Sequence, residues 1–262
     1  MGLYGGLLGI DISVDENPIE SANVLQIVSD LQQVIADFDR RPTYTVRGKG
    51  GQTFAFFATS VTDNIPPLQP RLSRAISSLS RLHLTQTHQA TLGVGEEDRG
   101  AMIISDILLS YDLPRTLARW TPSGAPGEIG IPLANEYIPE GSIQVFLNGV
   151  KPEDRVILVD DLISTGGTMV ALIQAVQKAG AEILEIFTIG EKTENRGREY
   201  VWQQTGYHVK TLLASGLVEK EDGQVVSTVT HCYLGNLLPT QFVEVAAHFP
   251  AGFCRPGSGE MS

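Results

Sequence analysis

The sequence predicts an α/β fold built on a doubly wound, mostly parallel sheet, with an N-terminal helix and hairpin added to it. The first observation is the aliphatic run Val156–Val159, which is typical of a strand buried on both faces of a parallel sheet. The second is the alternation of strand and helix patterns that continues from this run to residue 214. With 262 residues, 42% of them hydrophobic and 19% charged, the chain can also bury a large core.

An N-terminal extension over residues 1–58 precedes the predicted α/β domain. Apolar residues recur at helical spacing across Ser21–Phe38, and Ser21 is suited to cap the first turn. Two short runs rich in β-branched and aromatic residues, Thr43–Arg47 and Thr53–Ala58, flank the glycine cluster at 48–51. We therefore expect a helix followed by a β-hairpin.

Residues 59–220 carry the predicted α/β domain, and residues 221–262 form a C-terminal extension that we expect to pack on it. The predicted helices cover 70–84, 101–110, 169–180 and 195–205, and the predicted strands cover 90–94, 143–147, 156–159, 182–189 and 207–214. The segment 119–130 is rich in proline and glycine. We expect it to be a mobile loop.

The composition argues against several classes of protein. A count of 30 acidic against 19 basic residues gives a net charge of -11, whereas general nucleic-acid binding needs a basic face. Cys232 and Cys254 lack a metal-ligand spacing, so we expect neither a disulfide framework nor a structural zinc site. Because no apolar run approaches the ~20 residues needed to cross a bilayer, we expect no membrane contact and a cytoplasmic location.

The segment that follows Val156–Val159 carries the most informative chemistry. Asp160 and Asp161 come first, and Ser164–Thr168 then supplies small residues and hydroxyl groups before the next helix. Backbone N–H groups and the start of that helix can surround a phosphate, while paired carboxylates can accept ribose hydroxyls or share a divalent cation. The pattern lacks the lysine of a Walker A loop. The alternative is a helix cap and glycine turn with two solvated aspartates.

The run Val156–Thr168 resembles the motif with which type I phosphoribosyltransferases bind 5-phosphoribosyl-1-pyrophosphate (PRPP). It has four hydrophobic residues, two acids and a closing Thr-Gly-Gly-Thr. A broader region, 63–213, is similar to adenine phosphoribosyltransferases in particular. Asp63–Leu68 resembles their D-I-T-P-L segment, and Glu97–Gly100 resembles their E-A-R-G loop.

This resemblance implies a role for each matching position and Mg²⁺ as the cofactor. Ser164, Thr165, Gly166, Gly167 and Thr168 would hold the 5-phosphate, Asp160 and Asp161 would face the ribose hydroxyls and share the metal, and Glu97, Asp98, Arg99 and Gly100 would hold the pyrophosphate. Glu136 would serve the base as proton acceptor or donor. For 97–100 the alternative is a solvated acidic turn, and for Glu136 it is an ordinary loop glutamate.

The resemblance implies an enzyme that transfers the phosphoribosyl group of PRPP to a nucleobase, a purine such as adenine, and that forms a homodimer. Two departures bear on the base. Ala101 stands where the adenine family commonly has an aromatic residue, and Trp120 follows Arg119 where that family tends to carry a basic pair. We expect the segment 119–137 to close over the reactants. The alternative function is a non-catalytic PRPP sensor that regulates transcription, because a fold alone does not fix a function.

Overall fold

The computed structural model describes residues 23–47, 53–133 and 144–257, and within them the largest element is a seven-stranded sheet. Its strands are β3 (Leu92–Glu96), β4 (Arg115–Ala118), β7 (Arg155–Ile163), β8 (Glu182–Lys192), β9 (Lys210–Glu219), β10 (Val225–Tyr233) and β11 (Cys254–Arg255). They are ordered β11-β10-β9-β8-β7-β3-β4, and every neighbouring pair is parallel except β9 and β10. The predicted doubly wound, mostly parallel sheet is confirmed.

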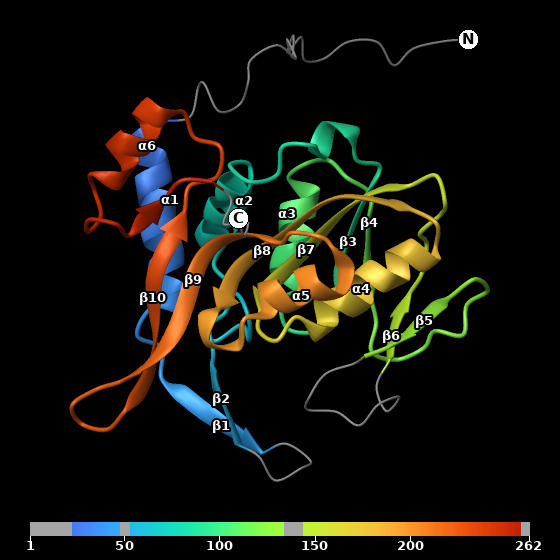
Figure 1. Cartoon of the computed structure of the whole chain (residues 1–262), viewed down its shortest axis with the longest axis horizontal. Helices are drawn as coiled ribbons and strands as arrows, with labels where there is room; N and C mark the ends of the chain where they lie inside the picture. Colours follow the sequence, from blue (N-terminus) through green and yellow to red (C-terminus); the bar gives the residue numbers. More distant parts are fainter. Residues whose placement is uncertain (1–22, 48–52, 134–143, 258–262) are drawn as a thin grey trace.

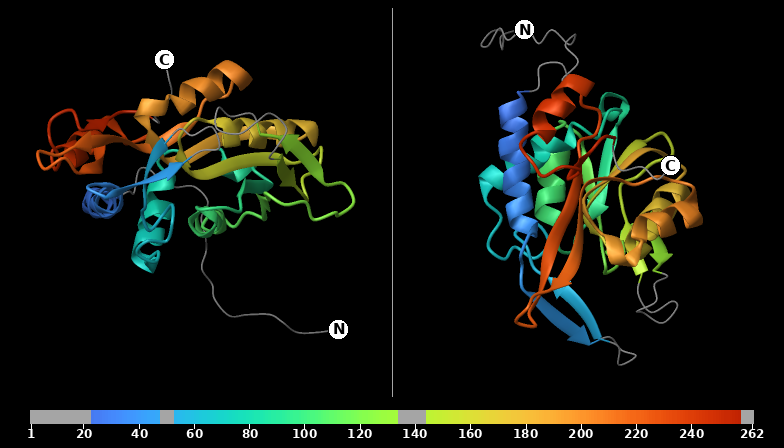
Figure 2. Two further views of the ribbon diagram at one scale, coloured as in Figure 1. Left: turned by 90° about the horizontal axis from the view of Figure 1, so that it is seen from below. Right: turned by 60° about the vertical axis from the view of Figure 1, so that its left-hand side comes forward.

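Helices cover both faces of this sheet (Figures 1 and 2). In the view from below in Figure 2, α1 (Val24–Phe38), α2 (Pro70–Ser80) and α3 (Ala101–Leu109) lie on one face, and α4 (Gly167–Lys178) and α5 (Gly197–Thr205) lie on the other. Each face has its own apolar core, because the strand side chains alternate between the two. Ile157 and Val159 pack with α3, whereas Val156 and Leu158 pack with α4.

Strand β7 carries the predicted acidic pair at its carboxyl end. Val156–Val159 is fully buried, as expected of a strand with helices on both sides. The strand is longer than predicted, however, since it pairs with β8 as far as Ile163. Asp160 and Asp161 are therefore strand residues and not part of the glycine loop. This gives their backbone the rigidity of the central sheet.

The N-terminal segment contains the predicted helix and hairpin. Helix α1 begins at Val24, and the Asn23 side chain caps it by accepting from Leu25 N at 2.9 Å. The predicted cap, Ser21, lies outside the described residues. Strands β1 (Thr43–Arg47) and β2 (Thr53–Phe57) pair antiparallel, which confirms the hairpin. Its root is tied to the main sheet, where Thr43 Oγ1 donates to Val225 O at 2.9 Å. The hairpin projects from the lower edge of the molecule in Figure 1.

The region 115–147 differs from the sequence expectation. Strand β4 was not predicted, although it forms one edge of the sheet beside β3. The Pro- and Gly-rich segment leads into β5 (Ile129–Pro132), which pairs with β6 (Gln144–Leu147) in a small separate sheet. A turn before β5 is held by Glu128, whose Oε1 accepts from Ser123 N at 2.8 Å and from Asn148 Nδ2 at 3.0 Å. Residues 123–128 of the expected loop thus form a hydrogen-bonded turn.

The C-terminal segment continues the main sheet across residue 220, because β10 pairs with β9. Helix α6 (Pro239–Ala246) then packs against α1. Cys232 and Cys254, although 22 residues apart, face each other on β10 and β11 with their sulfurs 3.5 Å apart. The division of the chain at residues 58 and 220 remains a proposal about folding units.

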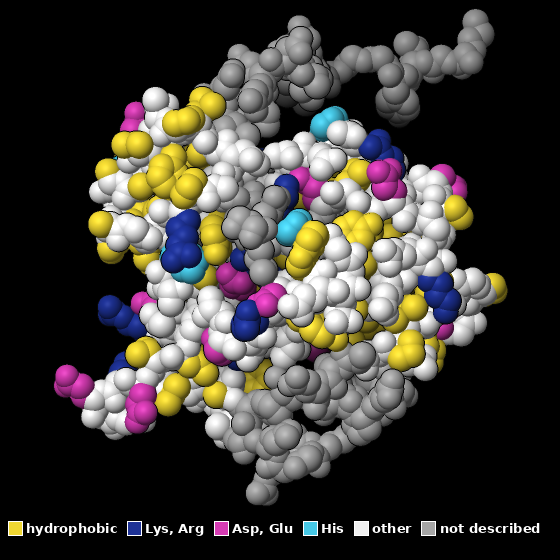
Figure 3. All heavy atoms as spheres, viewed as in Figure 1, with side chains coloured by type: hydrophobic (Ala, Val, Ile, Leu, Met, Phe, Trp, Pro, Cys, Tyr) yellow, Lys and Arg dark blue, Asp and Glu magenta, His cyan; other side chains and the backbone are white. Residues whose placement is uncertain are grey.

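The face of the molecule in Figure 3 shows Lys and Arg side chains scattered among acidic ones, with apolar side chains gathered over α6. Leu238, which precedes α6, and Val243, within it, are exposed apolar residues. Within 23–47, 53–133 and 144–257, none of the helices combines the length and the apolar character that crossing a bilayer requires.

Candidate active site

A pocket of about 250 Å³ opens where β3, β7 and β8 end. In a parallel sheet the carboxyl ends of neighbouring strands meet at one edge, and ligands commonly bind there. Six of the predicted site residues line the pocket: Asp98, Arg99, Asp160, Asp161, Ser164 and Thr168. The structure therefore brings together residues from three predicted groups, which lie up to 70 positions apart in the sequence.

The segment Ser164–Thr168 forms the turn from β7 into α4. Gly166 has a φ of +85°, in the left-handed region that favours glycine, and it is the residue that precedes α4. Gly167 is instead the buried first residue of the helix, so only one of the two glycines is needed for its backbone angle. No side chain caps α4 within the described part of the chain. Its first N–H groups and its positive dipole end are thus available to an anion.

The turn is braced by the start of α5. Asn195 Nδ2 donates to Ser164 Oγ at 2.7 Å. A Cβ on Gly166 would lie 2.5 Å from the carbonyl oxygen of Gly197, so the two backbones are in direct contact. Gly197 in turn lies against the Ser164 carbonyl. These contacts fix the conformation of the turn beside the pocket.

Three carboxyl groups are gathered at the floor of the pocket, those of Glu96, Asp160 and Asp161, and each residue is no more than 7% exposed. Glu96 ends β3 and was not predicted. Its Oε2 accepts from Trp120 Nε1 at 2.7 Å and from Asp98 N at 3.1 Å. The two aspartates follow each other on β7, and Asp160 Oδ1 accepts from Asp161 N at 2.9 Å.

The electrostatics of this cluster disfavour the ionised carboxylates. Burial, and then the charge of Asp160, raise the pKa of Glu96 to about 8. Burial, and then the charge of Glu96, raise the pKa of Asp161 to about 7. Burial, and then the charge of Asp161, also raise the pKa of Asp160 well above its ordinary value. A cluster of this kind is stabilised by hydroxyl donors or by a cation that lies among the oxygens.

The predicted pyrophosphate segment, 97–100, lies between β3 and α3 beside this cluster. Glu97 does not line the pocket; its carboxylate accepts from Trp120 N at 3.0 Å and pairs with Arg119 at 3.4 Å. Arg99 contacts Asp63 and Tyr44, each at 3.1 Å. Gly100 precedes α3, which has no side-chain cap of its own in the described structure. The segment thus places a second uncapped helix N-terminus at the pocket.

The remaining pocket residues were not among the predicted site residues. They are Phe56, Phe57, Thr62, Glu96, Trp120, Leu162 and Lys192. Lys192 is 6% exposed, and its Nζ donates to Ala55 O at 3.1 Å. An available signal was the position of Glu96, a charged residue just after the predicted strand 90–94. Glu136, the predicted proton acceptor or donor, lies outside the described residues.

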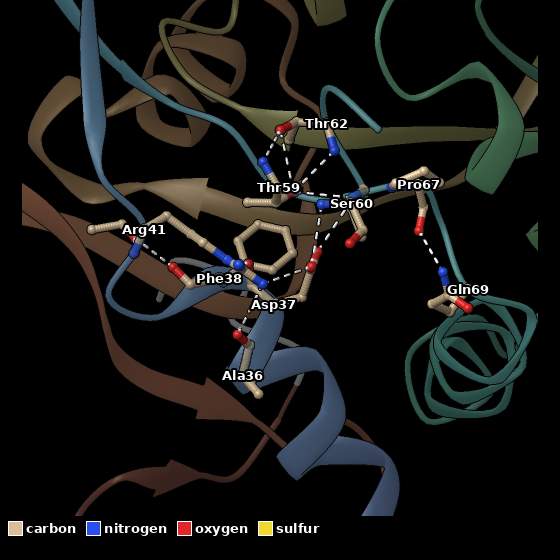
Figure 4. Close-up of polar contacts among 11 residues, drawn as sticks. Ala36, Asp37, Phe38, Arg41, Thr59, Ser60, Thr62, Pro67 and Gln69 are labelled. Atoms are coloured by element: carbon tan, nitrogen blue, oxygen red, sulfur yellow. Dashed lines mark hydrogen bonds and ion pairs between the residues drawn. The ribbon is translucent and has the colours of Figure 1, made fainter. Parts of the chain in front are cut away.

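A turn at 59–63, drawn in Figure 4, supports one wall of the pocket. Asp37, at the end of α1, is buried, and its Oδ1 accepts from Ser60 N at 3.1 Å and from Arg41 Nη2 at 3.1 Å. Thr59 Oγ1 accepts from Thr62 N at 3.0 Å. These bonds satisfy the backbone of a buried turn and fix Thr62, which lines the pocket. The N-terminal helix therefore contributes to the site through the Asp37 carboxylate.

Comparison with known proteins agrees with this geometry. The phosphoribosyl transferase domain family matches residues 98–212. The hypoxanthine/guanine phosphoribosyltransferase of Methanocaldococcus jannaschii is 34% identical over 66% of this chain and 90% of its own length. That of Methanocaldococcus infernus is 36% identical with the same coverage.

Two solved structures have the same fold. The adenine phosphoribosyl transferase of Trypanosoma brucei has a TM-score of 0.55 at 23% identity, with 71% of this chain and 78% of that chain covered. The adenine phosphoribosyltransferase of Saccharomyces cerevisiae has a TM-score of 0.54 at 22% identity, with 70% and 98% covered. Identities this low support the fold alone, whereas the archaeal relatives match at 34–36% over nine-tenths of their length. The chain belongs to the type I phosphoribosyltransferase family.

Proposed function

We propose that this enzyme transfers the 5-phosphoribosyl group of PRPP to a ring nitrogen of a 6-oxopurine, hypoxanthine or guanine, and releases pyrophosphate. The observation that carries the proposal is that the Asp160–Asp161 pair and the uncapped N-terminus of α4 meet in one pocket. An anionic sugar phosphate needs both features, because its phosphate requires N–H donors and its hydroxyls require acceptors.

Each end of PRPP has a matching group of residues. We assign the 5-phosphate to Ser164–Thr168, where the N-terminus of α4 and the hydroxyl groups can donate. The ribose hydroxyls would then face Asp160 and Asp161. The pyrophosphate would lie at 97–100, before the N-terminus of α3. In this arrangement both anionic groups of PRPP meet the positive end of a helix.

The acidic floor suits Mg²⁺, provided that the ligand supplies part of the coordination. Within the described residues, no group of three or more His, Cys, Asp or Glu side chains could hold a metal ion by itself. Mg²⁺ is commonly bound by one or two carboxylates together with substrate phosphate oxygens, and Asp160 and Asp161 could provide those carboxylates. When bound, the ion would neutralise charge on the departing pyrophosphate.

The base end of the pocket favours a carbonyl group on the base. Lys192 presents an ammonium group beside Phe56 and Phe57, and Leu162 also lines the pocket. An ammonium group can only donate hydrogen bonds, so it suits the carbonyl oxygen of hypoxanthine or guanine and not the amino group of adenine. The hypoxanthine/guanine relatives support the same choice. The proposed base therefore differs from the adenine that the sequence resemblance implied.

The proposal is tested by calorimetry with PRPP and Mg²⁺. Asp160→Asn and Asp161→Asn should each weaken PRPP binding by about tenfold or more, because a hydrogen bond to a charged group contributes about 1.5 to 3 kcal/mol. Asp222→Asn changes an exposed turn aspartate and serves as the matched control. Binding that is unchanged in both site variants would remove the ribose assignment.

A second measurement concerns the base. Lys192→Met keeps the length of the side chain but removes the donor, so it should raise the KM for hypoxanthine by about tenfold or more. The KM for PRPP should change less. A homodimeric state and a cytoplasmic location stay predictions.

A further inference from the structure

We propose that Arg99 is a positioning residue that fastens the β1–β2 hairpin over the base end of the site, and thereby couples the hairpin to the turn at 97–100. The assignment of a base end and a pyrophosphate end rests on the proposed function. The fastening itself rests on contacts between described residues.

Arg99 reaches the hairpin and its surroundings through three contacts. Its Nη1 donates to Tyr44 OH at 3.1 Å and lies 3.1 Å from Asp63 Oδ1. Its guanidinium also lies over the ring of Phe56, 5.3 Å from the ring centre. Since Tyr44 is on β1 and Phe56 is on β2, one side chain from the turn before α3 holds both strands of the hairpin.

Asp63 holds this contact in place from the side of the helical layer. Its Oδ2 accepts from Thr62 Oγ1 at 2.7 Å, and its Oδ1 lies 3.3 Å from Tyr44 OH. Thr62 belongs to the turn that Asp37 and Thr59 hold in place, as Figure 4 shows. Asp63 is therefore anchored to the helical layer independently of the hairpin. The Tyr44 hydroxyl is the group that joins the hairpin to both Asp63 and Arg99.

A second cation, Lys192, also contacts strand β2 of the hairpin. Lys192 Nζ donates to Ala55 O at 3.1 Å and lies 5.3 Å from the centre of the Phe56 ring. The Phe56 ring is also stacked on Tyr44, with ring centres 5.9 Å apart. Because an isolated two-stranded hairpin is only marginally stable in water, contacts of this kind decide where β1 and β2 lie.

The consequence is an energetic link between the two ends of the pocket. Phe56 and Phe57 line the pocket from the hairpin, and Asp98 and Arg99 line it from the turn at 97–100. A ligand that orders the turn will also order Arg99 and, through Tyr44, the hairpin. By linkage, the base and the pyrophosphate group should each strengthen the binding of the other.

Tyr44→Phe is the sharpest test, because it removes the hydroxyl that joins Arg99 and Asp63 but keeps the ring that stacks on Phe56. Tyr111→Phe is the matched control. It removes a hydroxyl that bonds Ser80 Oγ at 2.8 Å between α2 and the segment after α3, away from the pocket. Both variants are compared with the wild type by hydrogen exchange of the amides of β1 and β2 in the absence of ligand.

We expect Tyr44→Phe to lower the protection of the hairpin amides by about tenfold, the loss expected for a hydrogen bond to a charged group. Protection of the β7 amides should not change in Tyr44→Phe, and Tyr111→Phe should leave the protection of the hairpin amides unchanged. Hairpin protection within about twofold of the wild type in Tyr44→Phe would overturn the inference. This measurement needs no substrate, so its outcome is separate from that of the proposed function.

Calorimetry of hypoxanthine with and without pyrophosphate supplies the second readout. In the wild type, saturating pyrophosphate should lower the Kd of hypoxanthine, and in Tyr44→Phe this effect should shrink by about tenfold. Tyr111→Phe should keep the effect seen in the wild type. A pyrophosphate effect that is absent from the wild type or unchanged in Tyr44→Phe would contradict the inference, whereas a wild-type protein inactive on every purine would contradict the proposed function instead.

Discussion

The backbone of Gly100 lies directly against the side chain of Asp161. A Cβ at position 100 would overlap the Asp161 Cβ and would come within 2.9 Å of its Oδ2. The φ of Gly100 is -82°, which any residue can adopt, so the reason for glycine here is the close approach and not the backbone conformation. The turn before α3 and the acidic pair on β7 are therefore packed as one unit.

Gly100→Ala should displace Asp161 and lower kcat/KM for PRPP by about 10- to 100-fold, because small displacements of a positioning group are costly to catalysis. Gly216→Ala is the control, since a Cβ there would make only ordinary contacts, the nearest at 3.5 Å. The two variants are compared by steady-state kinetics. If Gly100→Ala had the kinetics of the control, the exact position of Asp161 would not determine kcat/KM for PRPP.

Gly166→Ala should lower the free energy of unfolding by more than Gly149→Ala. Both glycines have a φ near +80°, for which an L-residue costs about 1 kcal/mol, but only Gly166 has a neighbour in the path of a Cβ. The difference between the variants isolates the contact with Gly197. Urea unfolding measures it, and equal losses in the two variants would mean that the turn before α4 has room to relax.

Glu96 gives the protein a pH dependence whose sign follows from its raised pKa. With a pKa of about 8 in the folded protein, Glu96 keeps a proton that the unfolded chain releases above the ordinary value of 4.5. The contribution of Glu96 to the free energy of unfolding therefore falls as the pH rises from 4.5 to about 8, by about 1.4 kcal/mol for each pH unit. Glu96→Gln cannot ionise.

Urea unfolding of Glu96→Gln and wild type at about pH 5 and about pH 9 measures this effect. The variant should gain stability relative to the wild type at the higher pH. Glu219→Gln controls for the loss of an exposed charge. A stability difference between Glu96→Gln and wild type that stays constant with pH would contradict the assignment of a buried, protonated carboxyl group.

Duplex DNA should not bind tightly. The net charge is -11, and the face in Figure 3 shows basic side chains interspersed with acidic ones. We expect no gel shift at moderate salt, with or without PRPP. A sequence-specific shift that responds to PRPP would instead support the transcriptional regulator that the sequence left open as the alternative.

The parts of the fold that were predictable from the sequence are those with a strong local pattern. Val156–Val159 and the turn after it carry an apolar run, two acids and two glycines in an order that few other structures require. Strand β4 has no such pattern, because Arg115–Ala118 is short and lies at a half-exposed edge, and its position depends on pairing with β3.

The site was predictable only where its residues are consecutive. Phe56 and Phe57 belong to a hairpin that the sequence predicts, yet nothing local indicates that this hairpin reaches the pocket. Lys192 lies beyond the end of the predicted strand, and β8 reaches it only because β8 stays paired with β7 and β9. These residues are brought together by tertiary contacts, which sequence periodicity does not encode.

Pyrophosphate release from PRPP and Mg²⁺, measured with a panel of bases, tests the proposed transfer to a 6-oxopurine. Hypoxanthine, guanine and adenine are compared, with orotate and uracil as pyrimidine controls. We expect release with hypoxanthine and guanine and little or none with adenine, because Lys192 can donate to a carbonyl oxygen but cannot accept from an amino group. Release with adenine alone, or with none of the bases, would contradict the proposal.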